Sequence, residues 1–204
     1  PAISADGLTV YVASYGKKLH AVHAANGTRK WAYLSGGGME SSPVISPDGA
    51  TIFVGSRTDH KFHAVHAVNG TGKWVYEFER IVADEDFQQC CSSDKIHSET
   101  YSSPAISSDG NTVYVGGCDK KLHAFHAVNG TTKWTHNAGA YVQGSPVVSP
   151  DGLTVYYGNF VVNKDFSSPH NKLFAVWALN GTTKWSYATG NGIHSKPTIS
   201  ADGT

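Results

Sequence analysis

AFHAVNGTTKW, residues 124–134, decides the fold of this chain, because close copies of it end at Trp31, Trp74 and Trp185. A second marker, PAISSDG at residues 104–110, has copies that begin at Pro1, Pro43, Pro146 and Pro197. Successive copies of this marker are 42, 61, 42 and 51 residues apart. Repeats of this length indicate an array of one supersecondary unit. The chain therefore holds four units with a basic length of 42 residues, and two of them carry insertions.

Each unit predicts four short strands, which we name A to D in chain order. In the third unit they are expected at residues 102–107, 112–116, 121–127 and 131–136. Asp109-Gly110 separates strands A and B, and Asn129-Gly130, between C and D, predicts a two-residue type I′ turn. Four strands per 42 residues are typical of a propeller blade. We expect an all-β propeller arc of four blades plus the first strand of a fifth, which is half a ring or a fragment of a larger one.

The blades are predicted at residues 1–39, 40–99, 100–141 and 142–193, and residues 194–204 begin the next one. One insertion, residues 75–101, connects strand D to strand A of the following blade, and the other, residues 159–172, connects B to C. Antiparallel strands alternate in direction, so both insertions lie on the face that we call the insertion face. The A–B and C–D turns lie on the opposite face, which we call the turn face.

The charge balance and hydropathy exclude some classes of function. The chain has 204 residues, with 16 acidic and 16 basic side chains and no basic stripe, which argues against nucleic-acid binding. No apolar run reaches the roughly 20 residues of a membrane-spanning helix. We therefore expect no nucleic-acid partner and no membrane span.

The end of each unit resembles the tryptophan-docking motif of the quinoprotein (PQQ-like) β-propellers, in which alanine, glycine and tryptophan recur at fixed spacing. The alanines are Ala21, Ala64, Ala124 and Ala175; the glycines are Gly27, Gly70, Gly130 and Gly181; the tryptophans are Trp31, Trp74, Trp134 and Trp185. The resemblance implies that each tryptophan is mostly buried between neighbouring blades of a ring of seven or eight. It leaves function open, because the family includes PQQ-dependent dehydrogenases and assembly lipoproteins that bind no cofactor.

A candidate ligand site is predicted where strand A begins, at the mouth of the central channel on the insertion face. The residue three positions before each strand-A proline is expected there: Glu40, Tyr101, Gln143 and His194. Such a chemically mixed ring suits a small polar ligand. The alternative is that these side chains are solvated loop ends.

Two groups of residues resemble metal sites but favour other roles. Three H-x-x-H pairs occur, at His20/His23, His63/His66 and His123/His126. Side chains at i and i+3 of a strand point to opposite faces, so we expect packing between blades rather than metal binding. Four acidic residues cluster in the first insertion: Asp84, Glu85, Asp86 and Asp94. Their spacing matches no calcium loop. We expect neither calcium nor PQQ, and no metal.

Three cysteines, Cys90, Cys91 and Cys118, are all predicted on the insertion face. We expect Cys118 to lie close to Cys90 or Cys91 and to bridge one of them. The alternative, a bridge between the adjacent cysteines, resembles the vicinal disulfide of PQQ-dependent alcohol dehydrogenases.

The Asn-Gly-Thr triplets at Asn26, Asn69, Asn129 and Asn180 are acceptor sequences for N-linked glycans. Asn-Gly is also simply a favoured hairpin turn, but that turn does not require the following threonine. We therefore expect glycans on all four, at hairpin tips on the turn face.

These features favour a secreted or extracellular glycoprotein in which the propeller is a non-catalytic scaffold, adhesion or filament module. Protein partners or further copies are expected to bind at the insertion face or at blade edges. The alternatives are a fragment of a PQQ-dependent dehydrogenase, a carbohydrate- or peptide-binding propeller, and a periplasmic rather than extracellular location.

Overall fold

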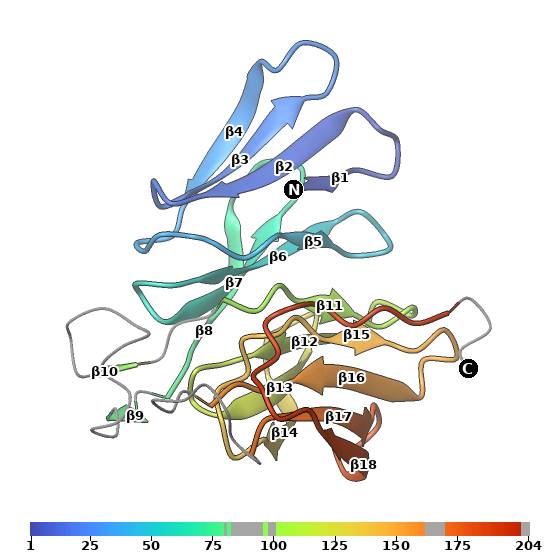
Figure 1. Ribbon diagram of the computed structural model, residues 1–204. Coiled ribbons are helices and arrows are strands. Elements are labelled where there is room, and N and C mark those ends of the chain that lie inside the picture. The colour runs from blue at the N-terminus through green and yellow to red at the C-terminus, as the bar shows by residue number, and fades with distance from the viewer. Residues whose placement is uncertain (80, 83–95, 98–100, 162–169, 201–204) are drawn as a thin grey trace.

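Four four-stranded antiparallel sheets form the molecule, and they follow one another as the blades of a propeller arc (Figure 1). The structure is a computed structural model that describes residues 1–79, 81–82, 96–97, 101–161 and 170–200. Within each sheet the strand order equals the chain order, from A to D. The predicted all-β fold with four four-stranded blades is confirmed.

Strand A of each blade has only two residues: β1 (Ala2–Ile3), β5 (Val44–Ile45), β11 (Ala105–Ile106) and β15 (Val147–Val148). The six-residue strand predicted at 102–107 is therefore too long. Before strand A the backbone no longer pairs with strand B. The serine next to each of two strand-A prolines donates its N–H to the next blade. Contact with strand B passes to the side chain of the serine before it, as when Ser102 Oγ accepts the N–H of Gly116. The backbone N–H of Ser42 donates to Ser103 Oγ at 2.8 Å, and the N–H of Ser103 donates to Ser145 Oγ at 3.0 Å.

The other strands have five or six residues each. Strands B are β2 (Thr9–Ser14), β6 (Thr51–Ser56), β12 (Thr112–Gly116) and β16 (Thr154–Gly158). Strands C are β3 (Lys18–His23), β7 (Lys61–His66), β13 (Lys121–His126) and β17 (Lys172–Trp177). Strands D are β4 (Arg29–Leu34), β8 (Gly72–Glu77), β14 (Thr132–Asn137) and β18 (Thr183–Ala188). β6 and β12 are buried along their whole length, because both faces of these sheets are covered by neighbouring blades.

Five residues separate strands C and D in each blade, 24–28 in the first, so the predicted two-residue type I′ turn is wrong. In the first blade the N–H of His23 bonds to the carbonyl of Thr28, and the N–H of Gly27 bonds to the carbonyl of His23. A type I′ turn needs positive φ at both central residues. Here Gly27 has φ 70°, whereas Asn26 is not among the residues with positive φ. The Asn26 side chain instead accepts the N–H of Thr28 at 3.0 Å, which stabilises the wider loop.

The hydrophobic core lies between blades rather than within them. One cluster joins Leu19 of the first blade to Ile52 and Val54 of the second. Equivalent clusters fill the second and third interfaces between blades. Each blade is therefore stabilised mainly by its neighbours.

The two faces of the arc differ as predicted from strand alternation. The B–C and D–A connections lie on one side, together with β9 (Ile81–Val82) and β10 (Ile96–His97), and the short A–B and C–D turns lie on the other (Figure 1). β9 and β10 pair with each other in the first insertion. That insertion starts later than residue 75, because residues 75–77 still pair with strand C as part of β8.

Residues 195–200 correspond to strand A of the other units, but no strand is assigned to them. Each of the other A strands pairs with a strand B of its own unit, and the described residues include no strand B after residue 200. Residues 196–199 instead line a groove of about 420 Å³ together with Val147 and Val148 of β15. The described part of the chain contains no helix with the length and apolarity that a membrane span requires.

Candidate functional site

The tryptophan of strand D forms the centre of each contact between neighbouring blades, which we call a joint. Its indole N–H donates to an alanine carbonyl of the next blade. The three bonds, each 3.0 Å long, run from Trp31 to Ala67, from Trp74 to Ala127 and from Trp134 to Ala178. The motif thus joins each blade to its successor.

A glycine of the next blade lies against each of these indole rings. A Cβ built on Gly70 would lie 2.5 Å from the Trp31 ring, and one on Gly130 would lie 2.6 Å from the Trp74 ring. These glycines also have positive φ, so two independent reasons exclude a side chain there. The alanine–glycine–tryptophan spacing of the sequence is therefore the signature of one joint.

Trp185 departs from the prediction that all four tryptophans are mostly buried. Trp134 is 9% exposed, Trp31 and Trp74 are half-buried, but Trp185 is 45% exposed. Trp185 belongs to the fourth blade, so no later blade within the described residues covers it. The prediction is wrong for this residue because its burial depends on a neighbour and not on its own blade.

A second aromatic contact supports each joint. The Tyr33 hydroxyl lies 3.0 Å from Nδ1 of His63 in the next blade, and the rings of Tyr76 and His123 lie 5.6 Å apart. In the third joint His136 bonds to the hydroxyl of Tyr157, and burial lowers the pKa of His136. Burial also raises the pKa of Tyr157. These groups are therefore held in their neutral forms.

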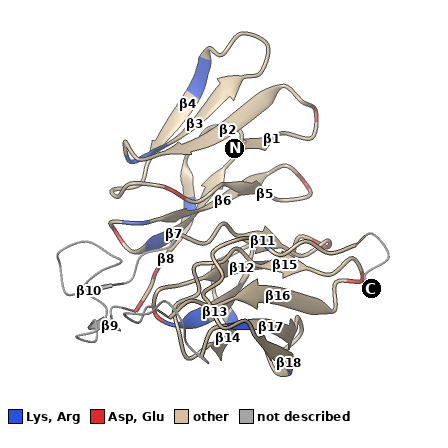
Figure 2. Ribbon diagram, in the orientation of Figure 1, with Lys and Arg blue, Asp and Glu red and all other residues tan. Residues whose placement is uncertain are grey.

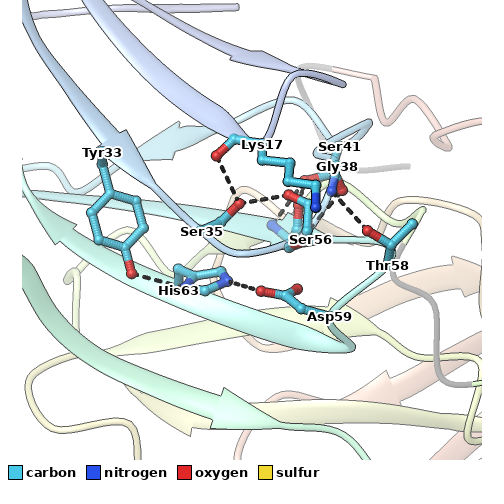
Figure 3. A network of polar contacts seen from close by, with 11 residues as sticks. Lys17, Tyr33, Ser35, Gly38, Ser41, Ser56, Thr58, Asp59 and His63 are labelled. Atoms are coloured by element: carbon cyan, nitrogen blue, oxygen red, sulfur yellow. Dashed lines mark hydrogen bonds and ion pairs between the residues drawn. The ribbon is translucent and has the colours of Figure 1, made fainter.

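Two buried histidine–aspartate pairs lie beside these contacts. His123 Nε2 is 2.8 Å from Asp119 Oδ2, and both side chains are almost inaccessible to solvent. His63 Nε2 is 3.6 Å from Asp59 Oδ2, and Figure 3 shows Tyr33 and Asp59 on opposite sides of the His63 ring. Burial alone would raise the pKa of Asp59, but the His63 and Ser56 side chains outweigh burial and lower it.

The tyrosine–histidine–aspartate row resembles a catalytic relay, but its position indicates a structural role. His63 and His123 are each 1% exposed, so a substrate in solvent does not reach their rings. A histidine–aspartate pair four residues apart occurs in two successive blades, as expected for residues that orient a joint. The pairs were not singled out from the sequence, although the spacing Asp59/His63 and Asp119/His123 was visible there.

The histidines of each H-x-x-H pair are separated as strand alternation predicts. His63 and His123 are buried, whereas His66 and His126 are exposed. Among the residues that the structure describes, no three His, Cys, Asp or Glu side chains are grouped as a metal site.

The structure brings together two of the four predicted channel-mouth residues. Arg57 Nη1 lies 2.8 Å from Glu40 Oε1, and the Arg57 guanidinium lies 4.9 Å from the centre of the Tyr101 ring. Arg57 was not predicted as a site residue, because it lies in a B–C turn where the four units differ. Glu40, Arg57 and Tyr101 form a polar and aromatic cluster on the insertion face, which we call the Arg57 cluster.

The other two predicted residues make different contacts. Gln143 is buried, and its Nε2 lies 4.0 Å from Sγ of Cys118. His194 packs against Phe160, with ring centres 4.1 Å apart. The structure therefore does not present Gln143 as an open ligand group.

Several predictions concern residues outside the described part of the chain. Cys90 and Cys91 lie there, so the predicted bridge to Cys118 stays a prediction; Cys118 itself is buried. The acidic residues of the first insertion, Asp84, Glu85, Asp86 and Asp94, also lie outside it.

The four asparagines of the Asn-Gly-Thr triplets are exposed at the tips of the C–D loops. In each triplet the threonine hydroxyl donates to the asparagine Oδ1, at 2.7 Å for Thr28 and 2.8 Å for the other three. The threonine therefore also stabilises the loop. This is a structural reason for the threonine that the sequence argument did not include.

The turn face carries a repeated charged network as well. Each A–B turn holds an aspartate, and Figure 2 shows acidic positions at these turns. Hydrogen bonds from Ser107 and from the N–H of Asn111 lower the pKa of Asp109, and the other three turns repeat this pattern. A lysine of strand D bonds across to a threonine of strand B, as Lys133 does to Thr112 at 2.8 Å. These contacts hold the turns in one shape in every blade.

A comparison with protein families agrees with these joints. The family model described as outer membrane protein assembly factor BamB matches residues 1–82 and 88–203. The chain belongs to this family of PQQ-like β-propellers. The predicted resemblance is confirmed.

Solved structures share the fold of this BamB-family chain. BamB from Moraxella catarrhalis matches with a TM-score of 0.70 and 18% identity over 98% of this chain and 52% of that one. A protein in the crystal structure of the mitotic checkpoint complex matches with a TM-score of 0.69 and 17% identity, over 95% of this chain and 52% of that one. The chain thus spans about half the length of these neighbours, and the likeness at such low identity is one of fold.

A curated relative matches a shorter segment. Protein Rv3035 of Mycobacterium tuberculosis is 41% identical over 51 residues, which are 25% of this chain and 12% of that protein.

Proposed function

We propose that this propeller is a non-catalytic scaffold in a secreted, N-glycosylated protein, and that it binds protein partners through the insertion face. The observation that carries the proposal is the exposure of four Asn-Gly-Thr asparagines at equivalent loop tips, on the face opposite the insertions. Asparagines at these loop tips are accessible to a glycosylating enzyme. Glycans attached there would leave the insertion face open.

The Arg57 cluster supports partner binding at the insertion face. Arginine and tyrosine are enriched in the centres of protein interfaces, where they combine apolar area with hydrogen bonding. Lys120 lies 5.5 Å from the centre of the Tyr141 ring on the same face, which adds a second cationic and aromatic pair. The description of the family refers to an assembly factor, and the name of one structural neighbour refers to a checkpoint complex.

Glycosylation is tested by producing the chain through a eukaryotic secretory route and measuring its intact mass before and after enzymatic deglycosylation. We expect a loss of mass equal to four glycans. The Thr71→Ala variant removes one acceptor sequence and should lose one glycan. An unmodified mass at all four asparagines would contradict the proposal and favour a periplasmic scaffold.

Partner binding is tested by photo-crosslinking from defined positions in the cells that make the protein. A photoreactive amino acid at Tyr101 reports on the insertion face, and one at Val68, an 87% exposed loop-tip residue, reports on the turn face. We expect one protein partner to be crosslinked from position 101 and not from position 68. The reverse pattern would contradict the choice of face.

The non-catalytic part of the proposal is tested independently. A PQQ-dependent dehydrogenase would contain a bound quinone, so the absorbance spectrum of the protein purified from its source should show no quinone band. A bound quinone would favour the enzyme alternative.

A further inference from the structure

The fourth C–D loop begins with a tryptophan where the other three begin with a histidine. Trp177 is the last residue of β17. The same strand position is occupied by His23, His66 and His126 in the first three blades. Trp177 stands three residues before Asn180 of the fourth Asn-Gly-Thr triplet. One of four otherwise similar loops therefore has a large, flat aromatic side chain at its base.

The backbone of the four loops is the same. In the fourth loop the N–H of Trp177 donates to the carbonyl of Thr182, and the N–H of Gly181 donates to the carbonyl of Trp177, both at 2.8 Å. The histidine at the same place in each other loop makes the same two bonds, at 2.8–2.9 Å. The loops therefore differ at this position in side chain and not in backbone geometry, so the other three serve as internal controls.

The exposure of Trp177 belongs to its position on the turn face and not to the fourth blade alone. Trp177 is 42% exposed. His66 and His126 hold the same position in the second and third blades, which have a neighbour on either side, and both are exposed. A neighbouring blade therefore leaves this position open, and a ring there is accessible to a ligand on the turn face.

Lys184 fixes the orientation of the Trp177 ring. Its Nζ lies 4.0 Å from the ring centre, a favourable place for a cation, and also donates to Thr154 Oγ1 at 2.9 Å. Thr154 is the strand-B residue opposite Trp177. The ammonium group thus covers one side of the indole, and a ligand would contact the other side.

Trp177 is also part of an apolar patch. Leu179, in the same loop, is 84% exposed, and Leu153, in the A–B turn, is 56% exposed. The N–H of Ala178 donates to the carbonyl of Leu153 at 3.0 Å, so the turn and the loop lie side by side. The equivalent of Leu153 in the third blade is the polar Asn111. Exposed apolar side chains that lie together mark a surface that a ligand covers.

The Asn180 side chain is held beside Trp177. Its Oδ1 accepts the N–H of Thr182 at 3.0 Å and the Thr182 hydroxyl at 2.8 Å. Thr182 lies opposite Trp177 across the hairpin, and residues that oppose each other in this way project to the same face. Because both bonds use Oδ1, the Nδ2 atom that would carry a glycan remains available. A sugar on Nδ2 would therefore start close to the indole ring.

A sugar and an indole are chemically suited to each other. N-acetylglucosamine, the first sugar of an N-linked glycan, has hydroxyls around the rim of its ring and C–H groups on its faces. Packing one face on an indole removes apolar area from water and leaves the hydroxyls solvated. The C–H groups also meet the negatively polarised face of the aromatic ring. Because the sugar is attached three residues away, its effective concentration at the ring is high.

We propose that Trp177 binds the first N-acetylglucosamine of a glycan on Asn180, so that this glycan, unlike the other three, is held against the protein. The inference rests on the proposed glycosylation, and it adds a sugar-binding site that the three histidine loops lack. The bound sugar would cover the apolar patch and make the Asn180 glycan an ordered part of the turn face.

The test compares the four glycans within one preparation of the protein made through a eukaryotic secretory route. The folded protein is treated with a glycosidase that cleaves the bond between asparagine and the first sugar, and site-resolved mass spectrometry follows release at each asparagine. We expect release from Asn180 to be about two- to tenfold slower than release from Asn129, because an aromatic contact of ordinary strength must open first. In the unfolded protein the two rates should be equal.

A reciprocal exchange of residues provides the matched control. Trp177→His gives the fourth loop the residue of the other three and should make release from Asn180 as fast as release from Asn129. His126→Trp should slow release from Asn129 in the third blade, which has a neighbour on either side. Both positions are exposed, so we expect neither variant to change the circular dichroism spectrum.

A second measurement detects the contact directly. After the glycans are trimmed to their first sugar, the N-acetyl methyl protons on Asn180 should resonate upfield of those on Asn129 in the NMR spectrum, because they lie near an aromatic ring. Trp177→His should remove this difference. The measurement separates contact with the indole from any other obstacle to the glycosidase.

The outcomes distinguish this inference from the proposed glycosylation. Equal release from Asn180 and Asn129 in the folded protein would overturn the sugar-binding site and leave glycosylation standing. So would an unmodified Asn180 beside three modified asparagines, or a slow release that persists in Trp177→His. A protein without a glycan at any of the four sites would overturn both.

Discussion

The indole N–H of Trp134 lies 3.0 Å from the carbonyl oxygen of Ala178 and joins the third blade to the fourth. Beneath the same ring, Gly181 leaves room that no other residue would leave. Trp185 repeats the side chain, but within the described residues no later blade lies against it. Comparing Trp134 with Trp185 therefore separates two contributions to the free energy of unfolding: contacts across a joint, and contacts of the tryptophan within its own blade.

Trp134→Ala should lower the free energy of unfolding by about 3–5 kcal/mol, as expected for a large buried aromatic side chain. Trp185→Ala should cost only roughly 1–2 kcal/mol, because about half of that side chain stays in water. Both losses are measured by urea unfolding of the single-substitution variants. Equal losses would show that the joint adds little.

Gly130→Ala should destabilise the protein more than Gly49→Ala, although both glycines have nearly the same φ, 73° and 72°. An alanine in this conformation costs about 1–2 kcal/mol at either position. At Gly130 the new Cβ would also lie 2.6 Å from the Trp74 ring, and such overpacking adds about 1–3 kcal/mol. Urea midpoints of the two variants provide the comparison, and coincident midpoints would refute close packing at this joint.

Thr131→Ala should lower the stability of protein made without glycans by about 0.5–1 kcal/mol, because it removes the 2.8 Å bond to Asn129 Oδ1. Thr131→Ser keeps both the hydroxyl and the acceptor sequence, so it should match the wild type within about 0.5 kcal/mol. Made by a secretory route, the serine variant should keep the Asn129 glycan and the alanine variant should lose it. A stable alanine variant would leave glycosylation as the only role of this threonine.

His136 should make stability depend on pH. Burial lowers its pKa in the folded state below 6.5, so the unfolded state binds more protons at mildly acidic pH. The contribution of neutral His136 is fully present above about pH 6.5 and is lost as pH falls through the lower folded-state pKa.

The measurement is the midpoint of urea unfolding, determined at several pH values between about 8 and about 5. His136→Gln should flatten this dependence, whereas His126→Gln, at an exposed position, should leave it unchanged. If the His136→Gln variant kept the full pH dependence of the urea midpoint, other titrating groups would be its cause.

The parts of the fold that depend on one repeat were predictable from the sequence. Strand β12 occupies the predicted residues 112–116, because its apolar residues and the flanking turns are local signals. The length of strand A was not predictable in the same way. It depends on bonds such as that of Ser42 to Ser103, which join residues from two different blades.

In the candidate site, too, the sequence predicts what the repeat determines and misses what depends on contacts outside it. Glu40 and Tyr101 were found because the repeat places their positions near the strand-A prolines. Arg57, which contacts both, lies in a turn where the units diverge, so the repeat carries no information about it. The exposure of Trp185 was missed for a related reason, since the motif describes a joint and only the arrangement of blades shows whether the other half is present.

The order of strands within each sheet has a consequence for how this chain folds. Three of the strand-C sequences, KLHAVH, KFHAVH and KLHAFH, are almost interchangeable, so any of them could complete another unit's hairpin. Because every strand of a blade pairs only with its neighbours in the chain, the correct partner is a few residues away and the wrong one is a whole unit away. Closing a short loop costs less entropy and occurs sooner than closing a long one. Each hairpin can therefore form as soon as it is synthesised, before the next copy that might exchange with it exists.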